Sequence, residues 1–222
     1  MGAVTRLGPR PTCAALVLGL LAALVAGCDL FKVARPEPGT GGSVLVANYS
    51  EPESCLYYMR VGIERKDDVG QTAYLGALAD STKDGVGFHA FFDEKVWSAY
   101  TGFKPTDWNL DYETQFVPLF LQKYADPYEL EWLPDSIHPY DEKPDLTHQI
   151  LHRRYEVRAV RQAPSPTLLI AVGYADLYFT QISADRWALA RWEDRLDPAV
   201  GVEPSDPVQR SFGYRRLNGS GG

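Results

Sequence analysis

The spacing of apolar residues changes along the chain, from a period of about four in the first half to two in the second. Residues 50–53 (Ser-Glu-Pro-Glu) have the pattern of a capping box, with Ser50 as the cap and Pro52 in the first turn. A helix is therefore predicted to begin here. Its buried stripe would be formed by Cys55, Leu56, Met59 and Ile63.

Two further helices are predicted before the change of period. The first would bury Tyr74, Leu75 and Leu78 on one side. The second would run over residues 109–124, where apolar side chains recur at four-residue spacing. Pro118 lies inside this stretch, and proline removes a backbone donor, so the pattern predicts a kink or the start of a second helix there.

Alternating apolar and polar positions predict strands. These segments are 85–92, 128–132, 149–161, 167–182, 186–195 and 211–216. Short connections at 163–166 and 184–185 join long strands and are typical of antiparallel hairpins. Helices followed by a long antiparallel meander predict an α+β fold, in which the N-terminal helices pack on one face of a curved antiparallel sheet.

The N-terminus has the pattern of a bacterial targeting segment. Arg6 and Arg10 precede an almost wholly apolar run, 13–27, which is interrupted by Gly19 and ends at Cys28. A spanning helix would need about 20 apolar residues, which disfavours a permanent transmembrane segment. Residues 24–28 (Leu-Val-Ala-Gly-Cys) resemble the lipobox of bacterial lipoproteins.

The lipobox resemblance implies cleavage before Cys28, a diacylglycerol thioether on Cys28 and acylation of the new amine. The protein would then be anchored to a lipid bilayer in the bacterial cell envelope, outside the cytoplasm. Asp29 resembles an inner-membrane retention signal, but sorting rules differ between lineages, so the inner and the outer membrane both remain open.

Composition divides the chain into four parts. We expect a signal peptide over 1–27, a lipidated cysteine with a flexible tether over 28–43, one folded domain over 44–217 and a disordered tail over 218–222. The formal net charge of −7 becomes −9 once the two leader arginines are removed, which disfavours nucleic-acid binding. Cys55 would have no disulfide partner and is interpreted as a buried apolar residue.

The folded part resembles the nuclear transport factor 2-like (cystatin-like α+β) domain found in uncharacterised bacterial lipoproteins. The resemblance depends on short segments along the chain: the helix at 74–80, the strand at 88–93, Trp108 before a helix, and the stretches at 185–195 and 211–214. It implies a cone-shaped fold that serves isomerases, dehydratases, binding modules and oligomerisation domains alike, so the fold alone does not give the chemistry.

One strand carries the candidate chemistry. Alternation over 168–182 puts Asp176 on the same face as Tyr174 and Tyr178. If this face looks into the cone, Asp176 would line a ligand pocket with Tyr155 of the neighbouring strand, and these residues could form a carboxylate–phenol group for proton transfer. His89 would line the core or the pocket. The structural alternative is that Asp176 is hydrogen-bonded to tyrosine hydroxyls or reaches solvent.

Apolar residues on both faces of this strand indicate that both faces are covered. Helices or a pocket would cover one face and a second subunit the other, which favours a homodimer.

No cofactor and no metal site is expected. His148 and His152 would share a strand face about 13 Å apart, too far to bind one ion together. His138 lies in an acidic loop with Asp135 and Asp141, but the spacing is not that of a calcium loop.

Three functions remain open. The first is a non-catalytic envelope domain that binds a protein or a small apolar ligand. The second is a cofactor-free lyase or isomerase, for which Asp176→Asn would abolish turnover in a folded protein. The third is a scaffold that acts through its dimer face.

Overall fold

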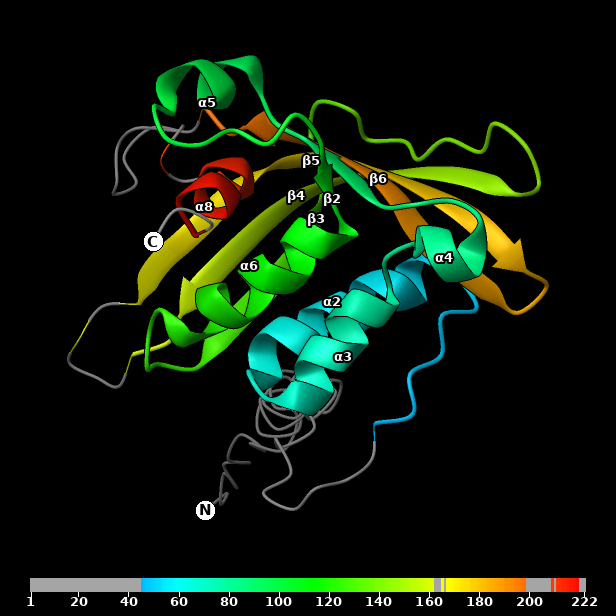
Figure 1. Ribbon diagram of the computed structural model, residues 1–222, viewed down its shortest axis with the longest axis horizontal. Helices are drawn as coiled ribbons and strands as arrows, with labels where there is room; N and C mark the ends of the chain where they lie inside the picture. The colour runs from blue at the N-terminus through cyan, green and yellow to red at the C-terminus, as the bar shows by residue number, and fades with distance from the viewer. Residues whose placement is uncertain (1–44, 162–164, 166, 199–208, 210, 220–222) are drawn as a thin grey trace, which may run out of the picture. The chain divides into compact units, whose positions relative to one another are not determined.

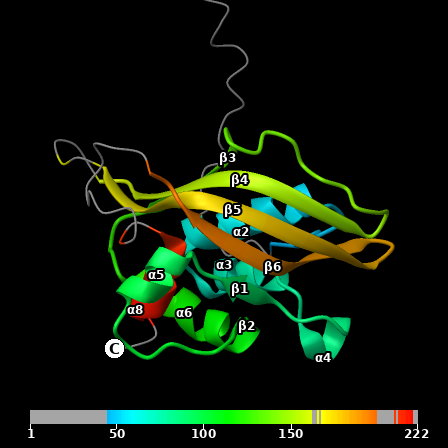
Figure 2. The same cartoon turned by 90° about the horizontal axis from the view of Figure 1, so that it is seen from above.

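A six-stranded sheet forms the centre of the fold, in the order β2-β1-β6-β5-β4-β3 (Figures 1 and 2). Four of its strands form an antiparallel meander: β3 (Tyr128–Pro134), β4 (His148–Ala159), β5 (Leu168–Ser183) and β6 (Arg186–Leu196). The short β1 (His89–Phe91) pairs parallel to β6, and β2 (Trp108–Asn109) pairs antiparallel to β1. The predicted meander is confirmed.

The computed structural model describes residues 45–161, 165, 167–198, 209 and 211–219. All of them lie in one compact unit, 43–222. The expected signal peptide (1–27), the tether (28–43) and the lipidation site Cys28 lie outside the described residues.

Six described helices complete the fold. They are α2 (Pro52–Arg65), α3 (Asp68–Gly76), α4 (Ser81–Asp84), α5 (Glu94–Ala99), α6 (Leu110–Gln122) and α8 (Phe212–Gly219). Figure 2 shows α2, α3, α6 and α8 on the same side of the sheet. We call the space between these helices and the sheet the cone interior, and the opposite side of β4–β6 the outer face. The predicted α+β arrangement, with helices on one face of a curved sheet, is confirmed.

Alternation along β5 assigns side chains to these two sides as predicted. Ala175, Leu177 and Phe179 are fully buried on the side of the helices. Asp176 lies between them in sequence, so it points to the outer face together with Tyr174 and Tyr178. The sheet therefore separates an apolar layer from a polar one.

Two details of the helices differ from the prediction. At α2 the N-cap is Glu51 rather than Ser50, and no side chain caps it, although Pro52 does occupy the first position. In α6 the helix continues through Pro118. Phe116 and Val117 on one side of the proline and Phe120 on the other are all buried, so packing outweighs the roughly 3 kcal/mol that an interior proline costs.

The C-terminal element is a helix, α8, and the strand predicted at 211–216 is wrong. Phe212 and Arg216 are buried four residues apart, which is helical spacing, and the Ser211 hydroxyl accepts a hydrogen bond from the Tyr214 amide at 3.1 Å. Asn218 and Gly219, expected at the start of a disordered tail, instead complete this helix.

Candidate functional site

The outer face brings together polar side chains from three adjacent strands. His152 of β4 lies directly opposite Asp176 of β5, which lies opposite Glu193 of β6. Two residues along these strands, and therefore on the same face, Tyr174 of β5 lies opposite Arg195 of β6. Residues directly opposite each other on neighbouring strands share a face, so the register alone gathers these groups on the outer face.

His152 and Asp176 form the centre of this group. Nδ1 of His152 is 2.6 Å from Oδ1 of Asp176, and Nη2 of Arg195 donates to the same oxygen at 2.8 Å. The His152 side chain is only 9% exposed and that of Asp176 only 12%. Charge-assisted bonds of this length fix both side chains on the strands.

A long loop between β3 and β4 crosses the outer face and is held by Asp135. The buried carboxylate of Asp135 accepts from Nη2 of Arg195 at 2.6 Å and from the amide of Ile137 at 2.6 Å. Burial alone would raise the pKa of Asp135, but the bonds from Arg195 and from the Ile137 and His138 amides outweigh it, so the pKa is lowered. Arg195 therefore ties the loop to Asp176.

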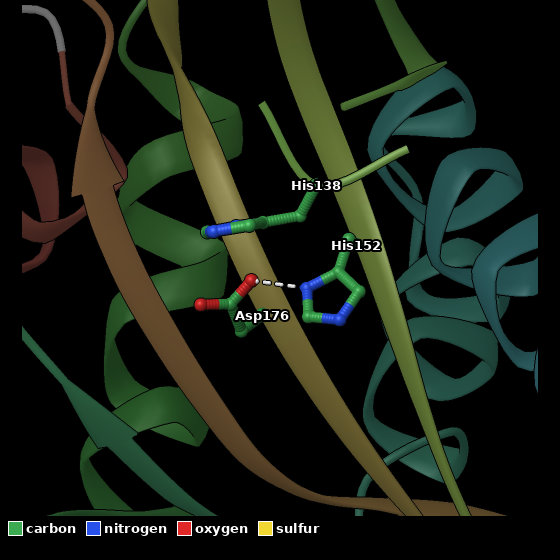
Figure 3. Close-up of side chains that lie close together, drawn as sticks. All are labelled: His138, His152 and Asp176. Carbon is green, nitrogen blue, oxygen red and sulfur yellow. Dashed lines mark hydrogen bonds and ion pairs between the residues drawn. The ribbon is translucent and has the colours of Figure 1, made fainter. Parts of the chain in front are cut away.

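This loop brings His138 next to His152. Their ring centroids are 5.4 Å apart, and one ligand-type atom from each of His138, His152 and Asp176 lies within 4.8 Å of the other two (Figure 3). From the sequence, His138 is grouped only with its acidic loop neighbours and His152 only with His148. The approach of His138 to His152 was therefore missed, because it depends on how the β3–β4 loop folds over the sheet.

Tyr174 and Tyr178 share a face with Asp176, as predicted, but this is the outer face and not the cone interior, so the expected place of Asp176 in a cone pocket is wrong. The two tyrosine hydroxyls bond elsewhere. The Tyr174 hydroxyl lies 3.4 Å from the Ser136 hydroxyl, and the Tyr178 hydroxyl donates to Glu193 at 3.2 Å. Burial and the neighbouring Glu193 carboxylate raise the pKa of Tyr178. The partners of Asp176 in the described chain are instead His152 and Arg195.

The expected grouping of Tyr155 with Asp176 is wrong. Tyr155 lies opposite Gly173, three residues along the strands from the His152–Asp176 pair. Because side chains alternate between the two faces of a sheet, Tyr155 points to the other side, into the cone interior. There its hydroxyl donates to Asp194 at 2.6 Å and accepts from the Phe212 amide at 2.8 Å.

His89 lies at neither the core nor a pocket. It points away from the core on the short strand β1, and its Nδ1 is 2.7 Å from the Asp107 carboxylate, with both side chains nearly half exposed. The strand β1 is only three residues long, and on it the His89 side chain is turned to solvent, so the expectation of a pocket-lining histidine is wrong.

Aromatic side chains fill the cone interior. Phe212 of α8 packs edge-on or tilted against four other rings, which belong to Phe116, Phe120, Tyr155 and Trp192. All five rings are buried. Packing of this density leaves the space between helices and sheet occupied by the protein itself.

A fully buried ion pair completes the filling of the cone. The guanidinium of Arg216 makes two parallel bonds of 2.9 Å to the carboxylate of Glu113. Glu113 also accepts from the Tyr74 hydroxyl and from the Trp108 indole, each at 2.7 Å. The carboxylate oxygens are thus fully engaged within the protein and do not point at open space.

Two surface hollows border α2. Glu53 and Tyr57 line both of them, Asn48 lines one, and Trp132 and Arg153 line the other. Among the described residues, no helix combines the length and hydropathy needed to cross a membrane.

Comparison with known proteins finds similarity among solved structures. No family model and no curated protein matches the sequence. Among solved structures, the chain is similar to a protein of unknown function from Mycobacterium tuberculosis, with 11% identity, a TM-score of 0.50, and coverage of 76% of this chain and 85% of that one.

Two further similar structures have nuclear transport factor 2-like descriptions. One is from Shewanella oneidensis and is of unknown function, with 13% identity, a TM-score of 0.38, and coverage of 65% of this chain and 98% of that one. The other is from Streptomyces avermitilis, with 9% identity, a TM-score of 0.43, and coverage of 63% and 89%. At these identities the likenesses concern the fold alone, and helices on one face of a curved antiparallel sheet are the arrangement that the sequence resemblance implies.

The cone interior has a measurable pH signature at Asp194. Burial raises the pKa of Asp194 to about 6, although hydrogen bonds from Tyr155 and Gly213 act in the opposite direction. An unfolded aspartate has a pKa of about 3.9, so between about pH 4 and pH 6 the folded chain binds more protons than the unfolded chain. The stability that Asp194 contributes is complete below about pH 4 and is lost as the pH rises through about 6.

We therefore predict that the free energy of unfolding of the wild type, minus that of Asp194→Asn, falls as the pH rises from about 4 to about 6 and is level above that. Urea unfolding over this pH range measures it, with Asp185→Asn, the same change in an exposed turn, as the matched control. Parallel curves for the wild type and Asp194→Asn would contradict the prediction.

Proposed function

We propose that the protein is a lipid-anchored envelope lipoprotein whose nuclear transport factor 2-like domain is a non-catalytic binding domain, and that it binds through the outer face of β4–β6. Cys28 would hold the domain at a membrane, and residues 28–43 would form the tether. The observation that carries the proposal is the division of the domain by its sheet, with a filled interior on one side and converging polar groups on the other.

The filled interior supports binding at the surface. A ligand inside the cone would have to displace buried rings such as Phe212 and Trp192, or break the Glu113–Arg216 pair. Removing one partner of a buried pair costs about 3–5 kcal/mol, and truncating a buried phenylalanine costs a similar amount. A ligand that entered the cone would have to offset these costs before it could bind.

The outer face supports the proposal because its polar groups are held in place and yet reachable. His152 and Asp176 are fixed by the strands, whereas the His138 side chain is 51% exposed and that of Arg195 is 27% exposed. Binding sites combine a few placed polar groups with access from solvent.

A second candidate is a cofactor-free proton-transfer enzyme. The observation in its favour is the 2.6 Å contact between His152 and Asp176, since a carboxylate that orients an imidazole is a common arrangement for a general base. It ranks second because the His152 and Asp176 side chains are only 9% and 12% exposed and Arg195 already donates to the same carboxylate oxygen, which leaves little of the pair open to a substrate.

Binding of a small apolar probe tests whether the cone interior is filled. We expect benzene not to bind the wild-type protein, because the cone is filled. Phe212→Ala, which removes a ring that is 1% exposed, should open a dry cavity that does bind benzene. Phe103→Ala makes the same change at a side chain that is 66% exposed and should behave like the wild type. Ligand-observed NMR measures binding for all three.

Benzene binding to the wild type, accompanied by a change in the fluorescence of the buried Trp192, would contradict the proposal. This outcome does not depend on whether Phe212→Ala folds.

The anchor is tested separately by intact-mass spectrometry of the full chain expressed in a bacterium and extracted from membranes with detergent. The expected wild-type mass is that of a chain beginning at Cys28 with acyl groups added. Cys28→Ala should retain residues 1–27 and carry no acyl mass. A wild-type chain that keeps residues 1–27 would contradict the anchor.

A further inference from the structure

We infer that His138, His152 and Asp176 bind one divalent first-row transition-metal ion, such as zinc, on the outer face. One ligand atom from each residue lies within 4.8 Å of the other two (Figure 3). Imidazole nitrogen together with carboxylate oxygen is a donor set that suits this class of ion. The inference rests on the proposed function, since it names the ligand class of that surface.

The three side chains need only a small movement to enclose an ion. With metal–ligand distances of about 2.0–2.2 Å, ligand atoms around a tetrahedral ion lie roughly 3.4 Å apart. His152 and Asp176 are fixed on neighbouring strands, whereas His138 belongs to the β3–β4 loop and its side chain is half exposed. A shift of at most about 1.4 Å by His138 brings its ligand atom from within 4.8 Å to that separation.

An ion would replace the proton that His152 and Asp176 now share. Nδ1 of His152 lies 2.6 Å from Oδ1 of Asp176. On binding, Nδ1 gives up this proton and Nε2 takes one up, so the imidazole stays neutral, the two atoms separate, and both coordinate the ion. Arg195 donates to the same Oδ1, so the other carboxylate oxygen of Asp176 can also turn to the ion.

The second nitrogen of each histidine faces a carboxylate outside the set. Nε2 of His152 is buried without a hydrogen-bond partner and lies 3.5 Å from Oε1 of Glu142. Nδ1 of His138 lies 3.7 Å from Oδ2 of Asp135. Metal-binding histidines usually donate their other N–H to such a carboxylate, which fixes the tautomer and the ring orientation. The orphaned nitrogen of His152 thus gains its partner when the ion binds.

The charges around the set suit a cation. Four carboxylates and two guanidinium groups lie in or around it, so the net charge is −2. The groups are those of Asp135, Asp141, Glu142, Asp176, Arg153 and Arg195. Arg153 is paired with Asp141 by two bonds, and Arg195 is shared between Asp135 and Asp176. Each positive group is therefore offset before an ion arrives.

The test is a zinc titration of the full chain, purified from membranes in detergent, stripped with a chelator and competed against a chromophoric chelator. We expect one zinc ion per wild-type chain. His138→Ala should weaken binding by more than about 10-fold, since even changes outside a ligand set cost 10–100-fold, and Asp176→Asn should weaken it as well. His148→Ala is the matched control, because His148 is also half exposed beside a carboxylate, Asp145, and should leave the affinity unchanged.

His138→Ala is the primary variant because its side chain is on the surface, so its thermal unfolding should match that of the wild type. The inference is overturned if the wild type binds no zinc, if binding survives both His138→Ala and Asp176→Asn, or if His148→Ala weakens it as much. A closed cone without zinc binding would defeat this inference alone. Benzene in the wild-type cone would defeat the proposed function whatever the zinc result.

Discussion

The buried ion pair between Glu113 and Arg216 is the constraint on which the rest of the domain depends. Glu113 lies on α6 and Arg216 on α8, and Tyr74 of α3 bonds to the same carboxylate, so one charged group holds three helices together. The guanidinium of Arg216 also lies 4.3 Å from the centre of the Trp192 ring on β6. A buried charge is tolerated only when paired and hydrogen-bonded, so these elements must keep their relative positions.

This constraint explains why polar chemistry gathers on the outer face. The pair and the rings around it occupy the interior that a cone fold would otherwise offer to a ligand. On the other side of the same strands, strict alternation presents His152, Asp176 and Arg195 side by side. Asp135 then ties the β3–β4 loop over them, and this brings His138 within reach. Fold stability and the proposed binding surface thus use opposite faces of one sheet.

The meander and the buried sides of most helices were predictable from the sequence. The spacing of apolar residues and the residues typical of turns can both be read from short stretches of chain. The helix α8 was missed because eight residues with Phe212 and Tyr214 two apart also fit a strand, and only tertiary packing of Arg216 decides between the two. Asp176 was found by alternation, but its true partners were not. Which residues of β4 and β5 lie opposite each other depends on register, and the approach of His138 depends on a loop conformation that no local pattern encodes.

The central claim is that the working surface of this domain is the outer face of its sheet, centred on the two histidines and Asp176. Anomalous diffraction at the zinc absorption edge, from crystals grown with zinc, tests it most directly. We expect a peak at about 2.0–2.2 Å from a nitrogen of His138, a nitrogen of His152 and an oxygen of Asp176. An outer face without a peak, or an ion held without His138 and His152, would contradict it.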